Sequence, residues 1–109
     1  MPLVGRPQRF RFRSWIKIHW GSATLEASVS GISANGMFIE TASPLSVGAT
    51  FSADLMIDPP LQMHCTVTRV DPSRGMAVRI AFAKREQENQ FTKLVEKVSA
   101  SQVVKKVLI

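Results

Sequence analysis

The residues best suited to chemistry form a short run near the start of the chain, Arg9-Phe10-Arg11-Phe12-Arg13. The planar guanidinium of arginine forms paired hydrogen bonds with phosphate oxygens, and its flat face stacks on aromatic rings. The two phenylalanines fit either of two roles, stacking on nucleic-acid bases or anchoring the segment to a hydrophobic core. The run therefore indicates an anion-binding element.

The excess positive charge is confined to this end of the chain. Residues 1–20 include five basic residues and no acidic one, whereas residues 21–109 include nine basic and eight acidic residues. A charge needed only for solubility would be spread over the surface. We therefore predict a basic arm over residues 1–13 with a polyanion or a phosphate as its partner. A plain solvated extension is the alternative where no further motif supports the arm.

The composition bounds the protein class. The 109 residues fit one domain with one core, and 45% of them are hydrophobic. Cys65 is the only cysteine, which excludes an internal disulfide and favours a reducing compartment. No stretch approaches the roughly 18 apolar residues of a membrane span, and the start has no long apolar segment. We expect a cytoplasmic protein without a membrane span.

Alternating apolar residues over residues 14–83 predict a mainly β fold. Six segments separated by turn signals follow this pattern, and a closed barrel removes the exposed edges of such a sheet. We therefore predict a six-stranded antiparallel β-barrel. The expected inner-face residues are Ile16, Ile18 and Trp20; Ala23, Leu25, Ala27 and Val29; Ala49, Phe51, Ala53, Leu55 and Ile57; Leu61, Met63, Cys65 and Val67; and Met76, Val78, Ile80 and Phe82.

Two positions depart from simple alternation. The segment 37–39 is apolar on both faces, which predicts a fully buried strand after the Asn35-Gly36 turn signal. Arg69 falls on the apolar parity of its strand and Val70 on the polar one, and a β-bulge there would restore the register.

From Lys84 the apolar spacing changes to three or four residues, which predicts a C-terminal α-helix that covers one barrel end. The apolar stripe consists of Phe91, Leu94, Val95 and Val98. After residue 101 the apolar positions shift to Val103, Val104, Val107 and Leu108. This tail, within residues 84–109, fits three uses: docking on its own barrel, forming a homodimer or, least favoured, lying on a membrane surface.

Two elements together resemble the PilZ domain family. The first is the Arg-x-x-x-Arg spacing of Arg9 and Arg13 ahead of the first strand. The second is the segment 31–39, which is similar to the Asp/Asn-x-Ser-x-x-Gly motif between the second and third strands of the family. The segment 75–82 is similar to the closing strand of the family, and the resemblance covers roughly residues 6–98.

The resemblance implies a PilZ-like β-barrel with a C-terminal helix that acts as a bacterial receptor for the second messenger cyclic di-GMP and is not an enzyme. It implies that Arg9 and Arg13 grip guanine edges and phosphates, that Ser33 contacts the ligand from the barrel wall, and that Gly36 allows the tight turn. An arm that closes over the ligand would relay binding to an effector protein. No cofactor other than this ligand and no DNA partner are expected.

The chain departs from the family motif at Gly31, where the family has Asp or Asn. The lost contact to a base corresponds to about 1–3 kcal/mol. A degenerate PilZ domain that serves as a protein-protein interaction module is therefore the alternative function. Arg11 is the candidate to replace in part an arginine that some family members carry at the position of Gln8.

Other reactive residue types have simpler interpretations. Ser33 lies between strands rather than before a helix, which argues against a hydrolase nucleophile. His19 and His64 have no cysteine or carboxylate at a metal-ligand spacing, so we interpret them as surface histidines. We assign Asn35 a structural role in its turn.

Overall fold

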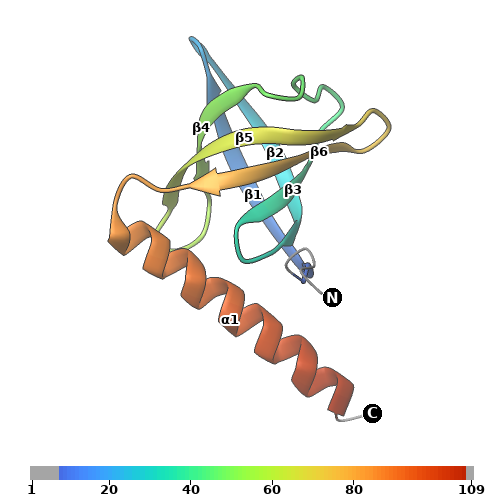
Figure 1. Cartoon of the computed structure of the whole chain (residues 1–109), viewed down its shortest axis with the longest axis vertical. Helices are drawn as coiled ribbons and strands as arrows, with labels where there is room; N and C mark the ends of the chain where they lie inside the picture. Colours follow the sequence, from blue (N-terminus) through green and yellow to red (C-terminus); the bar gives the residue numbers. More distant parts are fainter. Residues whose placement is uncertain (1–7, 108–109) are drawn as a thin grey trace, which may run out of the picture.

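Six antiparallel strands close into a barrel, and one helix follows them in the described part of the chain (Figure 1). The computed structural model describes residues 8–107, with side chains up to residue 102. Neighbours around the barrel follow the order β1-β2-β3-β6-β5-β4. The predicted fold is confirmed. The elements are β1 (Phe10–Trp20), β2 (Ala23–Ile32), β3 (Gly36–Glu40), β4 (Thr50–Leu55), β5 (Leu61–Asp71), β6 (Gly75–Ala81) and α1 (Arg85–Val107).

The alternating apolar side chains fill the barrel interior as predicted. Each such side chain stabilises the fold by about 1.5–3 kcal/mol when it is fully buried. Residues 36–39 of β3 are all buried, which confirms the strand predicted to be covered on both faces. The core includes Ile16, Ile18, Val29, Ile32, Met37, Ile39, Phe51, Leu55, Leu61, Met63, Cys65, Val67, Met76, Val78 and Ile80.

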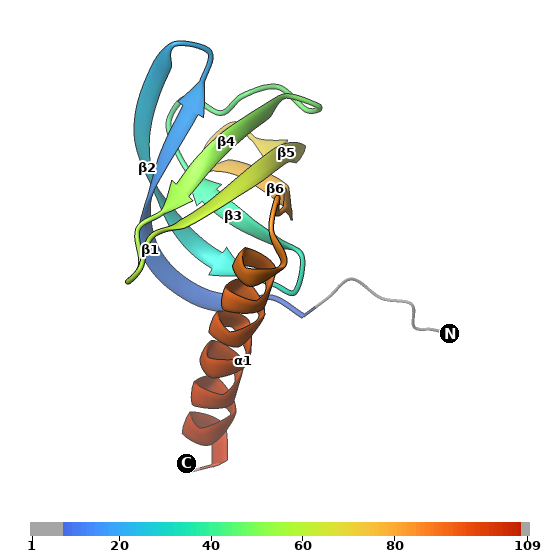
Figure 2. The same ribbon diagram turned by 90° about the vertical axis from the view of Figure 1, so that its left-hand side faces the viewer.

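The tip of the β1–β2 hairpin extends beyond the end of the barrel (Figure 2). We predicted Trp20, Ala23 and Leu25 as inner-face residues, and this prediction is wrong because all three are exposed, Trp20 by 48%. They follow the inward parity of Ile18, but β4 pairs with β1 only over residues 16–19. Beyond that point the hairpin has no opposite wall to pack against.

The predicted β-bulge in β5 is confirmed. The register of β5 against β6 shifts between Val67 and Arg69. This shift lets Val70 pack against the core and leaves Arg69 exposed on the outer surface. The bulge therefore places an arginine on the outer surface of the barrel without opening the core.

The strand β1 begins at Phe10, inside the segment that we assigned to the arm. Phe12 packs against the core, and Phe10 is partly buried and pairs with the fully buried Ile32. Of the two roles considered for these phenylalanines, Phe12 takes the anchoring one, whereas Phe10 lines a pocket described below. Residues 1–7 of the arm lie outside the described residues, and the division of the chain into arm, barrel and helix stays a prediction.

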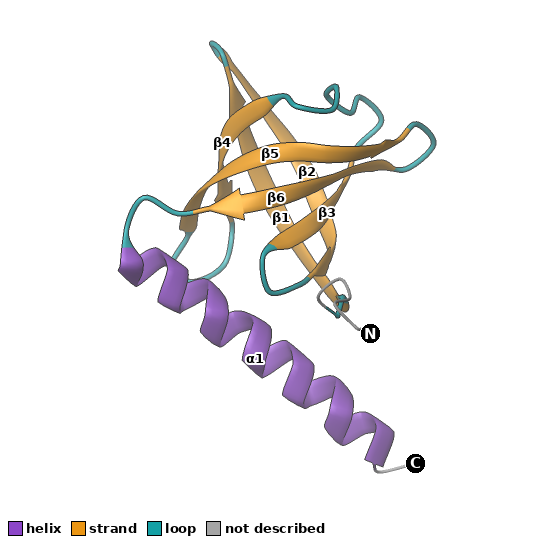
Figure 3. Cartoon of the chain, in the orientation of Figure 1, coloured by secondary structure: helices purple, strands orange, loops and turns teal. Residues whose placement is uncertain are grey.

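The helix α1 crosses one end of the barrel, on the side of the β4–β5 connection (Figure 3). Phe91 is the buried centre of this contact, and its ring centroid lies 5.6 Å from that of Phe82. Leu94, Val95 and Val98 pack against the same core, as the apolar stripe predicted. No helix in the described part of the chain is long and apolar enough to cross a membrane.

Two glutamine side chains attach α1 to the barrel by hydrogen bonds. Gln90 Nε2 donates to the carbonyl oxygen of Pro59 at 2.9 Å, and Gln102 Nε2 donates to the carbonyl oxygen of Arg11 at 2.7 Å. The helix continues past the predicted change of its apolar stripe. A homodimer through the tail stays a prediction, because it concerns side chains outside the described part, those of Val103, Val104, Val107 and Leu108.

Replacing Phe91 by alanine should destabilise the protein by about 3–5 kcal/mol, because it removes the ring that fills the space between α1 and the barrel. Urea unfolding followed by far-UV circular dichroism measures this loss. The exposed Lys93 of the same helix is the matched control, and Lys93→Ala should change the free energy of unfolding by less than about 0.5 kcal/mol. Similar losses in both variants would contradict the packing described for α1.

Candidate functional site

Arg9 lies directly over the glycine that interrupts the sequence motif. A Cβ atom placed on Gly31 would lie 3.5 Å from both Cγ and Cδ of Arg9 and 3.4 Å from the carbonyl oxygen of Phe10. Pairing of Arg11 with Gly31 across β1 and β2 sets this arrangement. The stem of Arg9 therefore occupies the space next to a side chain at position 31, and its guanidinium extends beyond.

The loop between β2 and β3 is held by contacts to one carbonyl group. The backbone N–H of Ser33 donates to the carbonyl oxygen of Gly36 at 2.9 Å, and the Ser33 hydroxyl donates to the same oxygen at 3.4 Å. Ser33 is only 8% exposed, so its hydroxyl lies at the wall rather than in solvent. The Asn35 carbonyl accepts a hydrogen bond from the backbone N–H of Ile80 at 2.9 Å, which ties the loop to β6 through the backbone.

Gly36 is required for a different reason from the one that we predicted. Its φ angle is outside the left-handed region, so the turn does not depend on that freedom. A Cβ atom at this position would lie 2.6 Å from the carbonyl oxygen of Val78 in β6. Only glycine lets β3 approach β6 this closely.

Two adjoining pockets surround this motif. They share the side chains of Arg9 and Arg69 and have volumes of about 320 Å³ and about 400 Å³. The first is lined by Arg9, Phe10, Arg11, Ser30, Gly31, Phe38, Arg69 and Arg74. The second is lined by Arg9, Ser33, Asn35, Gly36, Met37, Thr68, Arg69, Ala77, Val78 and Arg79. Five of the six predicted site residues therefore gather around one surface.

Arg13 is the predicted site residue that lies elsewhere. It lines a separate open hollow with Ser14, Trp15 and Ser28. Arg9 and Arg13 therefore face different pockets in this structure, and the expected two-arginine clamp is not assembled.

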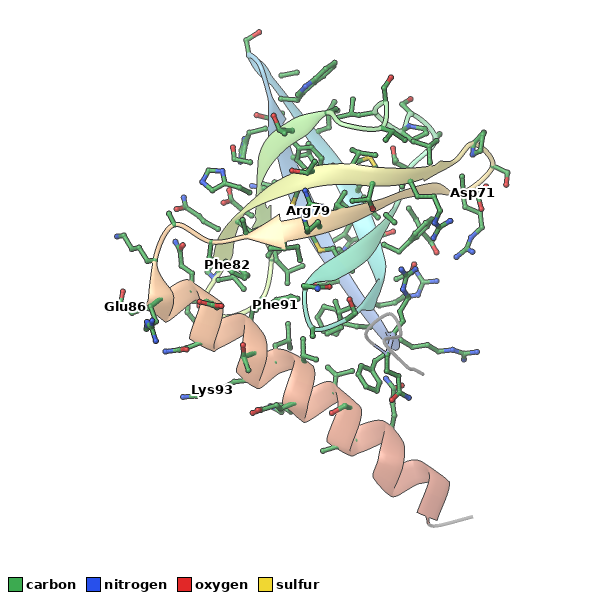
Figure 4. All side chains as sticks on the ribbon, in the orientation of Figure 1. Asp71, Arg79, Phe82, Glu86, Phe91 and Lys93 are labelled. Carbon is green, nitrogen blue, oxygen red and sulfur yellow. The ribbon has the colours of Figure 1, made fainter. Side chains whose placement is uncertain are left out.

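Three arginines of the site came from outside the sequence motif. The guanidinium carbon atoms of Arg74 and Arg69 lie 4.8 Å and 5.9 Å from the ring centroid of Phe38, which is only 4% exposed although it faces outward from β3. Arg79 lines the second pocket from β6 (Figure 4). Only one signal in the sequence pointed to these three arginines, the position of Arg69 on the apolar parity of its strand.

The β5–β6 turn places Arg74 beside Phe38. Asp71 accepts hydrogen bonds from the hydroxyl and the backbone N–H of Ser73, and these bonds lower the pKa of its carboxyl group. The backbone N–H of Arg74 donates to the Asp71 carbonyl oxygen at 3.0 Å. Because this pKa is lowered in the folded protein, the ionised Asp71 carboxylate stabilises the fold at pH values above the ordinary pKa of the group. This contribution is lost as the pH falls through the lowered pKa. Figure 4 shows Asp71 at the β5–β6 connection, where β5 ends.

The remaining reactive residues lie outside these pockets. Burial raises the pKa of the Cys65 thiol to about 12, so the thiol remains protonated at neutral pH and is a poor nucleophile. His19, which we interpreted as a surface histidine, has a partner across the sheet, because its Nε2 lies 2.9 Å from Oδ2 of Asp54 on the neighbouring strand β4. Within residues 8–107 no group of three His, Cys, Asp or Glu side chains is placed to hold a metal ion.

Comparison with known proteins supports a family assignment. The family model described as PilZ domain matches residues 5–100. The structure of Bacillus subtilis inhibitor of motility (MotI/DgrA) has a TM-score of 0.73 and 16% identity, and the match covers 95% of this chain and 53% of that one. The chain therefore spans about half the length of that protein. No curated protein matches in sequence.

A second solved structure is similar over its whole length. The PilZ domain with c-di-GMP of YcgR from Escherichia coli has a TM-score of 0.70 and 14% identity, and the match covers 98% of this chain and all 100% of that one. At these identities, likeness to the two solved structures shows the fold alone.

The two motif glycines should respond differently to alanine. Gly36→Ala should destabilise the protein by about 1–3 kcal/mol, because the new methyl group collides with the backbone of β6. Gly31→Ala should leave stability unchanged or raise it by up to about 1 kcal/mol, because its methyl group meets Arg9 at ordinary contact distance. Chemical denaturation of both variants tests this difference, and equal losses would contradict the close approach at Gly36.

Proposed function

Because the chain belongs to the PilZ domain family, we propose that it is a cytoplasmic receptor for cyclic di-GMP that relays binding to an effector protein. The observation that carries this proposal is the convergence of arginines from β1, β5 and the β5–β6 turn on the wall that contains Gly31. A similar solved structure, the PilZ domain with c-di-GMP of YcgR from Escherichia coli, supports the same ligand class. We infer a binding module rather than an enzyme.

The chemistry of the two pockets fits the ligand that we propose. Cyclic di-GMP carries two phosphates and two guanines, and each guanine presents the O6 and N7 acceptors that arginine recognises in pairs. Arg9 and Arg69 border both pockets and can reach groups in either. Phe38 under the guanidinium groups of Arg69 and Arg74 keeps these two side chains stacked and ordered before binding.

Closure of the arm is the proposed response to the ligand. Arg13 lies outside both pockets, so its participation requires the start of β1 to move. The contacts that resist this movement include the pairing of Phe10 and Arg11 with β2, the packing of Phe12 on the core and the hydrogen bond from Gln102 to the Arg11 carbonyl. Ligand contacts that Arg13 gains only after closure would have to offset the loss of these contacts.

An interaction module that does not bind the nucleotide is the second candidate function. Gly31 offers no side chain to a base, and the stem of Arg9 already covers that position. The similar structure from Bacillus subtilis is that of a protein named inhibitor of motility, and this name describes that protein alone. This candidate would keep the barrel and its surface without a nucleotide site.

Calorimetric titration with cyclic di-GMP tests the receptor function and the arm closure together. Wild-type protein should bind, and Arg9→Ala and Arg13→Ala should each weaken binding by about 10- to 100-fold or more, because each removes charge-assisted hydrogen bonds. Lys93→Ala, on the exposed face of α1, is the control and should bind as wild type. Loss of affinity in Arg9→Ala alone would refute closure, and no heat with wild type at high micromolar ligand would refute the receptor function.

The same titration on Gly31→Asp tests the departure from the motif. The added carboxylate should raise affinity by about 10- to 100-fold, because it supplies the missing acceptor for a base. Gly31→Ala is the matched control, since it adds the same Cβ atom without the acceptor. Weaker binding by Gly31→Asp than by Gly31→Ala would show that the carboxylate binds Arg9 at the expense of the ligand.

A further inference from the structure

An apolar patch lies on the outer wall of the barrel, away from the two arginine-lined pockets. Trp15 is 66% exposed and Met56 is 38% exposed. The backbone N–H of Met56 donates to the Trp15 carbonyl oxygen at 2.9 Å, and the Ser14 hydroxyl donates to the Met56 carbonyl oxygen at 3.4 Å. These bonds hold the two residues side by side. We call Arg13, Trp15 and Met56 the Trp15 patch.

The exposure of Trp15 is unusual for this wall. Outward-facing residues on the described strands are mainly polar or small, and Phe38 is the other large apolar one. Phe38 is covered by the guanidinium groups of Arg69 and Arg74, whereas most of the Trp15 ring is open to solvent. A partner that covered this indole would remove its apolar surface from water, and this burial would contribute favourable free energy to binding.

The surroundings of Trp15 have room for a partner side chain. An open hollow of about 440 Å³ is lined by Arg13, Ser14, Trp15 and Ser28. All four lining residues lie on the paired strands β1 and β2, where Trp15 pairs with Ser28. The hollow is therefore built on strands rather than on a loop.

The charges around the patch select the kind of partner. Arg11 and Arg13 precede Trp15 on the same exposed face of β1. Lys17, the next cation along the strand, lies opposite two acidic residues in the strand register, Glu26 in β2 and Asp54 in β4. The net positive charge therefore lies on the Arg13 side of the indole.

We propose that the Trp15 patch docks an acidic segment of a protein that carries a large apolar side chain. Tryptophan, methionine and arginine are enriched in the buried centres of protein interfaces, and tryptophan and arginine dominate their binding energy. The apolar side chain contacts Trp15 and Met56, and the carboxylates of the segment pair with Arg11 and Arg13. This proposal does not depend on cyclic di-GMP binding.

A single-stranded nucleic acid fits the patch less well. Such a ligand needs a basic track along its backbone and successive aromatic platforms. Here Lys17 is the next cation after Trp15, but Glu26 and Asp54 at the opposite positions give that side a net negative charge, which would repel phosphates. The observations therefore favour a protein partner.

Selection from a phage-displayed library of random dodecapeptides on the full chain, without nucleotide, tests the proposal. Peptides retained by wild type and rejected by Trp15→Ala should be rich in Asp and Glu around an aromatic or aliphatic residue. Synthetic copies of these peptides should bind a Trp20→Phe background with a change in Trp15 fluorescence. Trp15→Ala, titrated by calorimetry, should weaken this binding at least 10-fold.

Trp20→Ala is the matched control, because Trp20 is exposed on the projecting hairpin and lies outside the patch. It should leave peptide affinity unchanged, and far-UV circular dichroism should show that both alanine variants are folded. Selected peptides that are basic, that depend on Trp20, or that show no dependence on Trp15 would overturn the proposal. Binding of a single-stranded oligothymidylate that requires Trp15, without peptide selection, would overturn it in favour of a nucleic acid.

Discussion

The pairing of β1 with both β2 and β4 is the constraint on which the rest of the structure depends. It closes the barrel and fixes the parity of β1, so that Ile16 and Ile18 point inward while Arg11, Arg13 and Trp15 are exposed. A slip of one residue would exchange these two sets, bury guanidinium groups and expose the isoleucines. That exchange would cost more than the total stability of a small domain. The cationic face of β1 is therefore specified as strictly as the core.

Gly31 and Arg9 show how one small residue sets the geometry of the candidate site. Because Gly31 has no side chain, the stem of Arg9 lies directly against β2 and its guanidinium reaches both pockets. An aspartate there would add an acceptor for a base, but it would also place a carboxylate beside Arg9. The five N–H donors of one guanidinium would then be divided between the wall and the ligand. Position 31 therefore balances a direct ligand contact against the freedom of the arginine above it.

The features that could be predicted from the sequence depend on local patterns. Alternation along each strand was sufficient to predict the core and the barrel, and the position of Arg69 on the apolar parity was sufficient to predict the β-bulge. The pairings that could not be predicted join residues far apart in the sequence. His19 and Asp54 are 35 positions apart, and Phe38 meets Arg69 and Arg74 only because β3 neighbours β6 and the bulge redirects Arg69.

Strand lengths explain the error at the hairpin tip. The strand β1 has 11 residues and β4 has 6, and alternation gives no information on how far one strand extends past its neighbour. Trp20 therefore has the parity of a core residue without a core around it. Gly36 was predicted as a motif residue. The reason why glycine is needed there is the close approach of β6, which could be recognised only from the order of the strands in the sheet.

Arg13 lies between the two proposed surfaces and can serve only one of them at a time. An extended strand advances about 3.3 Å per residue, so the Cα atom of Arg13 is about 7 Å from those of Arg11, at the first pocket, and Trp15. If the nucleotide draws the Arg13 guanidinium away, the Trp15 patch loses a cation that an acidic partner would pair with. The coupling through Arg13 is limited by what one such charge contributes, about 1.5–3 kcal/mol. Arg11 lines the first pocket and also pairs with the acidic segment, so it is shared in the same way. Because coupling is reciprocal, a partner that holds Arg13 weakens nucleotide binding by the same factor. A signal of this kind requires a new position for one side chain and the start of one strand, while the barrel stays as it is.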